Sequence, residues 1–402
     1  MTASVAYVEL SEIMASRTGN IDPTKFPDKQ FELYSIPAHD AGAPDITTGA
    51  QIGSTKQLVQ DGDVLLSKIV PHIRRSWIVE RQTNSQLIAS GEWIVFRSNR
   101  FDPNYLRHLL ISDAFHQQFM NTVAGVGGSL LRARPAFVAR IRVPMPNMPE
   151  QRRIAEVLDQ VDVLREKRRK SIALLGNLAQ SIFLDMFATG NSDWPIRTVE
   201  DLAIHRKNSI RTGPFGSQLL HEEFVDDGIS VLGIDNAVDN EFKWGRARHI
   251  TEEKYRQLKR YTVFPGDVLI TIMGTCGRCA VVPDDIPTAI NTKHLCCITL
   301  DRSRCLPEYL HGYFLQHPTA QNYLRQTAKG AIMAGLNMGI IKSLPVAVPP
   351  LELQDLYTQQ TRRIRESRAD ANRHLRYLDT LFASIQSRAF RGELWQDDVK
   401  DL

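Results

Sequence analysis

The sequence predicts an α+β protein built as a tandem duplication, in which each repeat is a globular part followed by one long helix. Three observations predict this class. Two distant stretches carry the same helical pattern, the offset between them is constant, and short strand-like segments lie in the middle of each globular part. The 402 residues suffice for two ordinary domains and a connector.

The first long helix is expected over about residues 150–188. Its apolar residues recur at alternating steps of three and four, as in the seam of a coiled coil. Pro149 and Gly190 stand where helix start and stop signals belong. At roughly 55 Å, such a helix is too long to bury its stripe in one small domain, so it needs a partner helix. The predicted seam consists of Ile154, Val157, Val161, Leu164, Leu175, Leu178 and Ile182.

The partner helix is expected near the other end of the chain, over about residues 353–390. Ile154 precedes Tyr357 by 203 residues, and Leu175 precedes Leu378 by the same interval. This shared register favours pairing between the two helices over a separate scaffold for each. The second seam consists of Tyr357, Gln360, Ile364, Ala371, Leu378, Leu381 and Ile385.

The two globular parts are expected over residues 1–146 and 191–349. In the first, a Pro-, Asp- and Gly-rich loop stretch over 20–53 precedes three strand-like segments that begin at Val64, Trp77 and Trp93. A helix is then expected from Asp102-Pro103 through Phe119. The second part repeats this order, because Gly266-Asp-Val-Leu and Pro307-Glu-Tyr-Leu follow Gly62-Asp-Val-Leu and Pro103-Asn-Tyr-Leu by 204 residues.

Composition excludes few classes of function. The net charge of +4 does not by itself indicate a nucleic-acid-binding protein, so any basic surface must be local. The N-terminus lacks a signal-peptide pattern, and no run reaches the apolar length of a membrane span. All five cysteines lie between 276 and 305, and their odd number favours reduced thiols in a cytoplasmic protein.

Several motifs, taken together with the duplication, carry a resemblance to a known family. They are Thr212-Gly-Pro-Phe-Gly-Ser-Gln-Leu, Pro265-Gly-Asp-Val-Leu, Gly274-Thr-Cys-Gly-Arg, and a proline followed by glutamine at the start of both helices. The whole chain resembles the specificity subunit of type I restriction–modification systems. Two departures are visible: the first globular part lacks the Gly-Pro-Phe-Gly-Ser stretch, and the second helix starts with Leu351-Glu-Leu-Gln.

The resemblance implies two target-recognition domains with small twisted β-sheets, at 1–146 and 191–349, and two long helices, at 147–190 and 350–402. The helices would form an antiparallel coiled coil with pseudo-twofold symmetry. Each domain would read one half of a split target in double-stranded DNA, and the helices would set the distance between the halves. Two methylation subunits would dock and bring S-adenosylmethionine. Restriction and translocase subunits would bring ATP and Mg, so no cofactor is expected in this chain.

No catalytic motif is found in the sequence. Val348-Pro-Pro-Leu lacks the polar residue and the aromatic of an amino-methyltransferase box, and no P-loop is present. Pro283-Asp284 is nuclease-like, but Asn291-Thr-Lys lacks the carboxylate that would help to hold a metal ion. We therefore expect a non-catalytic subunit of a methyltransferase and endonuclease complex.

A zinc site is one interpretation of Cys276 and Cys279 together with Cys296 and Cys297. Thiolates two residues apart can occupy two corners of a tetrahedron. The adjacent pair is poor geometry for the other two corners, and buried cysteine often acts as a small hydrophobe. We expect no metal site.

Basic and polar residues near loops and strand ends are the candidate DNA contacts. Some would hold phosphates and others would read base edges. The candidates are Lys68, Arg74, Arg75, Arg132, Arg134, Arg206, Lys207, Arg211, Ser217, Lys243, Arg246, Arg278 and Lys293, and Arg248 belongs to the same basic cluster. For any one of them the alternative is an ordinary solvated surface residue. For the whole chain, the alternatives are a stand-alone methyltransferase or nuclease, and a protein–protein adaptor built on a helical spacer.

Overall fold

The computed structural model describes residues 6–15, 18–125, 131–188, 193–328 and 336–394. The chain divides into two compact units, residues 1–169 with 373–402 and residues 170–372. Each unit contains one globular part and one half of each long helix, and each is described here by itself. The expected helix stop at Gly190 and the C-terminal residues 395–402 lie outside the described residues.

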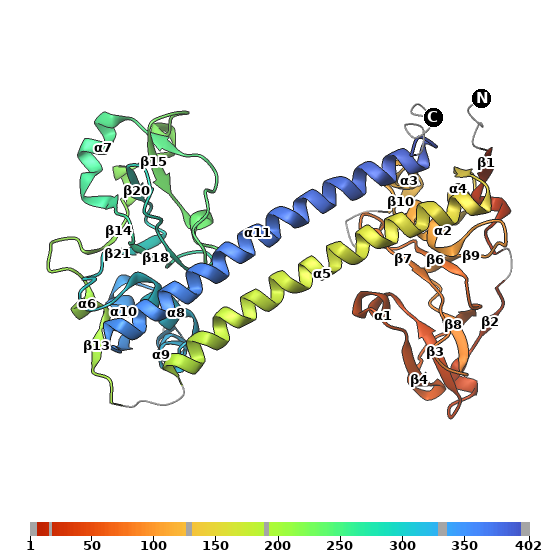
Figure 1. Ribbon diagram of the computed structural model, residues 1–402, viewed down its shortest axis with the longest axis horizontal. Helices are drawn as coiled ribbons and strands as arrows, with labels where there is room; N and C mark the ends of the chain where they lie inside the picture. Colours follow the sequence, from red (N-terminus) through yellow and green to blue (C-terminus); the bar gives the residue numbers. More distant parts are fainter. Residues whose placement is uncertain (1–5, 16–17, 126–130, 189–192, 329–335, 395–402) are drawn as a thin grey trace, which may run out of the picture. The chain divides into compact units, whose positions relative to one another are not determined.

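The globular part of the first unit contains two sheets and several short helices (Figure 1). The larger sheet has the order β2-β5-β8-β3-β4, and the smaller has the order β7-β6-β9. Their strands are β2 (Asn20–Ile21), β3 (Gln30–Tyr34), β4 (Asp45–Thr48), β5 (Lys56–Leu58), β6 (Val64–Ser67), β7 (Ser76–Ile78), β8 (Gln86–Ala89) and β9 (Trp93–Phe96). The strand pairs β1 (Ala6–Glu9) with β12 (Arg142–Met145) and β10 (Val123–Ala124) with β11 (Arg132–Ala133) stand apart, and the short helices are α1 (Ile36–Ala41), α2 (Pro103–Leu110), α3 (Asp113–Met120) and α4 (Pro135–Val138).

The second unit has two four-stranded sheets, with the orders β14-β21-β18-β19 and β16-β15-β20-β17. Their strands are β14 (Ile210–Thr212), β15 (Ile229–Leu232), β16 (His249–Ile250), β17 (Thr262–Val263), β18 (Val268–Thr271), β19 (Cys279–Val281), β20 (Ala289–Asn291) and β21 (Leu295–Ile298). A separate pair joins β13 (Ile196–Thr198) to β22 (Pro345–Ala347), and the short helices are α6 (Val199–Leu202), α7 (Glu252–Leu258), α8 (Pro307–Gln316), α9 (Pro318–Ala328) and α10 (Met338–Lys342).

The two globular parts follow one plan, as the duplication predicts. Each has one parallel strand pair, β3 with β8 in the first unit and β15 with β20 in the second. Each also has an antiparallel trio, β7-β6-β9 and β19-β18-β21. A strand pair that joins the start of the globular part to its end completes each repeat. The α+β class is therefore confirmed.

The two long helices are α5 (Met148–Phe187) and α11 (Leu351–Phe390). In the first unit the N-terminal part of α5 lies beside the C-terminal part of α11, where Arg165 Nε donates to Asp379 Oδ1 at 2.7 Å. In the second unit the C-terminal part of α5 lies beside the N-terminal part of α11, where the rings of Phe183 and Tyr357 are 5.4 Å apart. The pairing is therefore antiparallel, as expected.

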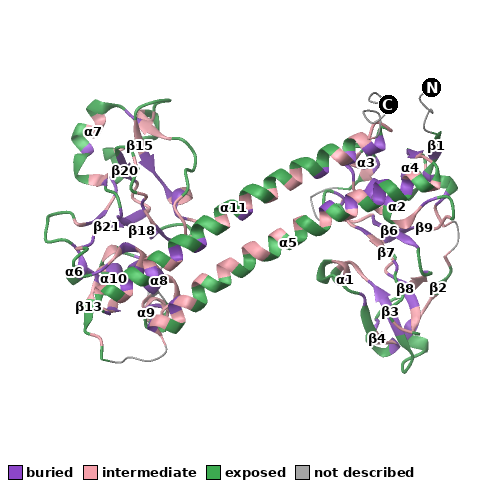
Figure 2. Cartoon of the chain, viewed as in Figure 1, coloured by how far each residue is buried: buried purple, intermediate pink, exposed green. Residues whose placement is uncertain are grey.

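The seam predicted from the leucine pattern is only partly right. Ile154, Val161, Tyr357 and Ile364 are buried, and Val157, Leu175, Ile182, Leu378 and Ile385 are half-buried. Leu164, Leu178 and Leu381, however, are exposed by 50%, 46% and 47%. Figure 2 shows buried residues gathered toward the ends of both helices.

The reason for this error is visible in the first unit. The contact face runs through Leu158, Arg165 and Phe382 instead of their neighbours Val157, Leu164 and Leu381. The Arg165 guanidinium lies 4.4 Å from the centre of the Phe382 ring while it pairs with Asp379. A buried arginine stem can replace an apolar seam residue, so the leucine pattern placed Ile154 and Val161 correctly but misplaced the seam positions between and after them by one residue.

Each globular part is attached to a helix by a buried glutamine, at Gln151 and at Gln354. Gln151 accepts from the Asp102 backbone and donates to the carbonyls of Arg100 and Pro146. Gln354 accepts from the Leu306 backbone and donates to the carbonyls of Arg304 and Pro349. The glutamine of the repeated proline-then-glutamine motif thus attaches the helix to the domain through hydrogen bonds.

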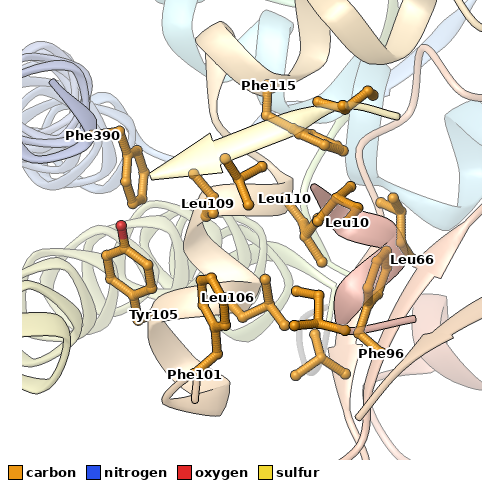
Figure 3. Close-up of a cluster of buried hydrophobic side chains, with 14 of the residues drawn as sticks. Leu10, Leu66, Phe96, Phe101, Tyr105, Leu106, Leu109, Leu110, Phe115 and Phe390 are labelled. Carbon is orange, nitrogen blue, oxygen red and sulfur yellow. The ribbon is translucent and has the colours of Figure 1, made fainter. Parts of the chain in front are cut away.

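Aromatic residues fill the junction between each globular part and the helices. In the first unit Tyr105 donates to the Pro144 carbonyl, and its ring lies 5.5 Å from that of Phe390 (Figure 3). In the second unit Tyr309 donates to the Ala347 carbonyl, and its ring lies 4.9 Å from that of Phe187. Both tyrosines are fully buried, so the repeated Pro-x-Tyr-Leu motif is a core motif.

The repeated Gly-Asp-Val-Leu motif is also structural. Gly62 and Gly266 have φ of +83° and +75°, a conformation that suits glycine. The buried Asp63 carboxylate receives two hydrogen bonds from Arg97, at 2.7 and 2.6 Å. The buried Asp267 likewise pairs with an arginine, Arg211. Arg97 directly follows β9, whereas Arg211 lies in β14, so the two arginines do not come from corresponding strands.

Two expectations about local structure are wrong. Residues 20–53 are not a plain loop stretch, since they contain β2, β3, α1 and β4. Their prolines and glycines only separate these elements. Phe119 does not belong to the helix that begins at Pro103, because Ser112 caps a new helix by accepting a hydrogen bond from the Phe115 backbone.

Candidate nucleic-acid interface

In the second unit the ends of four strands meet at one place. β15 and β20 are parallel, so the residues that follow them emerge at the same edge. Backbone hydrogen bonds join the turn after β20 to the ends of β15 and β14, from Thr292 N to Leu232 O and from Gly213 N to Thr292 O. Another joins Ile272 N, after β18, to His294 O at 2.9 Å. We call the loops 213–218, 233–236, 272–278 and 292–294, with the adjoining segment 243–248, the second rim.

The second rim brings together the motifs that the sequence singled out. Gly213 of the Gly-Pro-Phe-Gly-Ser stretch lies so close to the backbone of Asn291 and Thr292 that a Cβ there would collide with it. Gly274 has φ of +70°, and a Cβ there would lie 3.0 Å from the Ile234 side chain. The glycines of both motifs therefore allow the loops to touch one another.

Cations gather along the second rim. Burial lowers the pKa of His294, and the neighbouring charges of Lys293 and Arg248 lower it further. The side chain of Lys243 donates to Asp239 at 2.8 Å, which lowers the Asp239 pKa, and the nearby charge of Arg278 adds to this shift. Four of the predicted basic contacts belong to the rim: Lys243, Arg246, Arg278 and Lys293.

Asp235 organises the adjoining segment. Its carboxylate accepts from the Arg246 backbone at 2.6 Å and from Arg248 Nη1 at 3.0 Å. Burial alone would raise the pKa of Asp235, but these hydrogen bonds outweigh it and the pKa is lowered. The carboxylate is therefore charged at neutral pH and fixes the shape of the segment.

Apolar side chains stand beside these cations. Phe215, Trp244 and Met273 are exposed by 47%, 58% and 39%. The Trp244 ring lies edge-on to that of Phe242, at 5.5 Å. Exposed aromatic rings among cations form a surface that can contact bases as well as phosphates.

The first unit has a corresponding rim, which we call the first rim: residues 35–41, 68–75, 90–92 and 131–133. It follows the parallel strands β3 and β8 and the strand β6. Lys68 N donates to Glu92 O, and Ala133 N donates to Lys68 O, so these segments are joined. Two hydrogen bonds from Arg75 lower the pKa of Asp40 to about 2.

Comparison with known proteins supports a common origin for this arrangement. Residues 191–360 match the family described as the type I restriction modification DNA specificity domain. The type I restriction enzyme EcoBI specificity subunit of Escherichia coli is 28% identical over 293 residues, which are 65% of this chain and 60% of that protein. The StySPI specificity subunit of Salmonella potsdam is 24% identical over 322 residues, 75% of this chain and 68% of that protein.

Residues 191–360 thus match a type I restriction modification DNA specificity domain, and the chain is similar to type I specificity subunits.

Solved structures agree with this family in their fold. A chain from a study of complex assembly and conformational transition of the type I restriction–modification system superposes with a TM-score of 0.58 at 20% identity, covering 97% of this chain and 98% of that one. The specificity subunit of the type I system of M. genitalium also gives 0.58, at 11% identity, with 96% of each chain covered. The similarity in fold therefore covers nearly the whole chain and not only the matched residues 191–360.

In this chain several predicted contacts of the first unit already have partners. Arg74 pairs with Asp113 at 2.5 Å, and Arg132 pairs with Glu92 at 2.9 Å. Arg75 gives both Nε and Nη2 to Asp40 and is almost buried. Arg134 lies on the exposed Phe137 ring, 3.9 Å from its centre. Of the five candidates in this unit, Lys68 and Arg134 have no ion pair among the described residues.

Three candidates of the second unit lie away from its rim. Arg211 is only 4% exposed and holds Asp267 inside the domain, so as a DNA contact it was a wrong prediction. Its long basic side chain gave no sign of the buried partner. Arg206 and Lys207 precede β14, at the end opposite the rim, and Arg206 lies over the Phe264 ring. Ser217 is exposed within the rim loop 213–218.

Asp235, Trp244 and His294 were missed by sequence reasoning. Asp235 follows a buried strand, which is a usable signal for a residue at a strand end. Trp244 lies beside the candidate Lys243, and only its exposure marks it. His294 adjoins Lys293 and becomes informative only through the turn that brings it to the rim.

The cysteines do not converge on one point. Cys296 and Cys297 are adjacent in β21 and face different hydrophobic clusters. Burial raises the pKa of the Cys279, Cys296 and Cys297 thiols, which disfavours the thiolates that zinc binds. Among the described residues no group of three or more histidine, cysteine, aspartate or glutamate side chains could hold a metal ion. Nor does any described helix have the length and apolarity to cross a bilayer.

Proposed function

We propose that this chain is the DNA sequence-recognition subunit of a type I restriction–modification complex and that it binds a bipartite target in double-stranded DNA. One observation carries the proposal: the second rim lies within the residues that match the DNA specificity domain, and the first unit repeats the same plan. Two rims on one chain imply two half-sites, one for each domain.

The charge of the second rim suits a polyanion. Among the described residues Lys243 pairs with Asp239 and Arg248 pairs with Asp235. The side chains of Arg246, Arg278 and Lys293 form no ion pair there. Such an excess of cations releases counterions from DNA, so binding weakens steeply with salt. Exposed Phe215 and Trp244 add contacts that depend on the bases or on the shape of the groove.

The helices supply equivalent surfaces for two copies of a partner. Leu174 and Leu178 of α5 are exposed by 66% and 46%, and Tyr377 and Leu381 of α11 by 65% and 47%. The two pairs are 203 residues apart, and each unit contains one of them. Exposed apolar pairs of this kind mark interaction sites. We infer that each pair docks one methylation subunit.

Catalysis belongs to the partners in this proposal. The methylation subunits bring S-adenosylmethionine, and the restriction and translocase subunits bring ATP and Mg. Within this chain the rims position DNA, and the helices hold the two recognition domains at a set separation. The purified chain alone is therefore expected neither to methylate nor to cleave DNA.

A gel-shift experiment with random duplex DNA across a salt series tests the binding. We expect the apparent affinity to fall by about 10³-fold or more between 50 and 200 mM salt if six or more phosphates are contacted. An affinity that does not change with salt, or no binding at all, would contradict the proposal. In a second step, methylation should appear only when the methylation subunits are added, and turnover by the chain alone would overturn the division of roles.

The docking surfaces are tested by pull-down of the methylation subunit. Replacing Leu174 and Leu178 by serine should remove one bound copy, and replacing Tyr377 and Leu381 as well should remove both. Exposed residues tolerate such changes, so the variants should melt at the wild-type temperature. Lys167→Ser, which replaces an exposed charged residue on α5, is the control. Two retained copies in the fourfold variant would show that the methylation subunits dock elsewhere.

A further inference from the structure

Arg248 of the second rim is held by one edge and free at the other. Its Nη1 donates to Asp235 Oδ1 at 3.0 Å. Nε and Nη2 have no hydrogen-bond partner among the described residues, and neither is sealed from solvent. The Arg248 side chain is 26% exposed. A guanidinium in this state presents two parallel N–H groups outward in a fixed plane.

Two glycines make room for this arrangement. A Cβ on Gly245 would collide with the Asp235 carboxylate, and a Cβ on Gly233 would lie 2.8 Å from both Arg248 Nη1 and Asp235 Oδ1. Neither glycine has a positive φ, so the need for glycine is one of space. Asp235 also accepts from the Arg246 backbone, which fixes the chain two residues before Arg248. The arginine is therefore oriented before any ligand arrives.

Two other arginines near the strand ends, Arg75 and Arg211, lack this geometry. Arg75 gives Nε and Nη2 to Asp40, and its Nη1 is buried without a partner, so no edge is left for a base. Arg211 is buried and forms an ion pair with Asp267 inside the domain. Arg74 of the first rim also bonds its aspartate, Asp113, through Nη1 alone. Arg248 differs from Arg74 in that its partner Asp235 is itself fixed by a backbone hydrogen bond, from Arg246 N.

The neighbouring carboxylate decides which DNA group suits Arg248. Asp235 already balances its charge and would repel a phosphate that came close. A guanine edge is neutral overall and offers two acceptors, O6 and N7, with the spacing of two parallel N–H groups. Arginine is the usual partner of that edge.

We propose that Arg248 is a specificity-determining residue that reads a guanine in the half-site bound by the second domain, and that Asp235 is its positioning residue. This inference rests on the proposed DNA-recognition function and adds to it a residue, a base and an orientation mechanism. Arg246, Lys293 and Arg278 then serve the backbone around that base.

Selection from a library of random duplex oligonucleotides, performed with the full-length chain, tests the proposal. The wild type should select a bipartite motif with an invariant guanine in one half. Arg248→Ala should bind DNA but lose the preference for that guanine by about 10- to 100-fold, with the other half-site unchanged. Arg248→Lys keeps the charge without the planar fork, so it should lose most of the same preference.

The Asp235→Asn variant tests whether Asp235 orients Arg248, separately from any effect on folding. It keeps the size of the side chain and weakens the hold on Arg248, so the preference should fall at the same base position and nowhere else. Arg256→Ala is the matched control, because Arg256 lies on α7 with a side chain 74% exposed. Its selected motif should equal that of the wild type. Melting curves of all variants show whether each one is folded.

The outcomes are distinguishable. A folded Arg248→Ala chain that selects the wild-type motif unchanged overturns the role of Arg248 and leaves the proposed function standing. A loss of preference spread over both half-sites, or an Asp235→Asn effect at a different base, also overturns it. If the wild-type chain enriches no sequence at all, the proposed function itself fails. If Arg248→Ala does not fold, the Arg248→Lys result decides by the same criteria.

Discussion

At the scale of single residues, the repeated motifs separate into structural and functional ones. The two helix-entry glutamines, the two domain tyrosines and the two Gly-Asp turns all satisfy buried polar groups. They are the same in both repeats because both repeats need the same fold. The rims carry the residues that differ, as expected if the two domains bind different sequences.

Replacing either helix-entry glutamine should destabilise its own unit. Gln151→Ala or Gln354→Ala leaves a buried backbone N–H and two carbonyls without a partner, which costs about 1–3 kcal/mol. Urea unfolding measures this loss, and two transitions are possible if the units unfold separately. Gln160→Ala, at an exposed position of α5, should change stability by less than about 0.5 kcal/mol. Equal stability of all three variants would show that the glutamine hydrogen bonds do not stabilise the attachment of helix to domain.

Arg211 should be a stability residue. Arg211→Ala leaves the buried Asp267 carboxylate without its cation, and breaking a buried pair in this way costs about 3–5 kcal/mol. The variant should lose thermal stability, and no single base preference should change in whatever folded fraction remains. A fully stable variant that selects an altered target sequence would show that Arg211 contacts DNA and is not a stability residue.

At the scale of elements, the long helices were the most predictable part of the chain. The expected spans 150–188 and 353–390 agree with Met148–Phe187 and Leu351–Phe390 to within two residues at every end. Strands β6, β7 and β9 were also found, because each is a short apolar run between turn residues. Strand β3 was missed, because its flanking prolines and glycines looked like one continuous loop.

The seam and the rims show why pattern alone falls short. Leu164 is apolar but exposed, and Arg165 is charged but forms part of the helix contact through its stem and its pairing with Asp379. Arg211 and Arg248 look alike in sequence, yet one is buried and the other is open at one edge. These differences depend on contacts between residues far apart in the chain, which periodicity does not record.

The helix pair should act as a ruler between half-sites. Inserting one heptad after Arg168 and one after Ala371 keeps the two helices in register and lengthens the pair by about 10 Å. That equals roughly three base pairs at about 3.4 Å each. Three base pairs also turn B-DNA by about 100°, so binding should weaken while DNA or protein twists to compensate.

The readout is target selection from a library with randomised spacer lengths. The preferred spacer should grow by one to about three base pairs, and both half-site sequences should stay the same. A matched control inserts seven residues into the exposed connector near Asp226, which leaves both helices unchanged and should leave the spacer unchanged as well. If the heptad variant still binds with its original spacer, the helices do not set the distance.

At the scale of the whole molecule, we propose that two copies of one domain plan read two independent half-sites. The domains share the core of their strand orders and a helix attachment, and their rims differ in charge and in aromatic residues. The first rim has most of its arginines paired with carboxylates, whereas the second has exposed Phe215 and Trp244. Independence follows because each rim is built entirely within its own unit.

The most direct test replaces residues 1–145 by the matching part of another specificity subunit and then maps the methylated target in a host that carries the methylation subunits. We expect a bipartite motif in which one half changes to that of the donor, while the other half and the spacer length stay as in the wild type. A change in both halves, a change in neither, or a single continuous motif would contradict it.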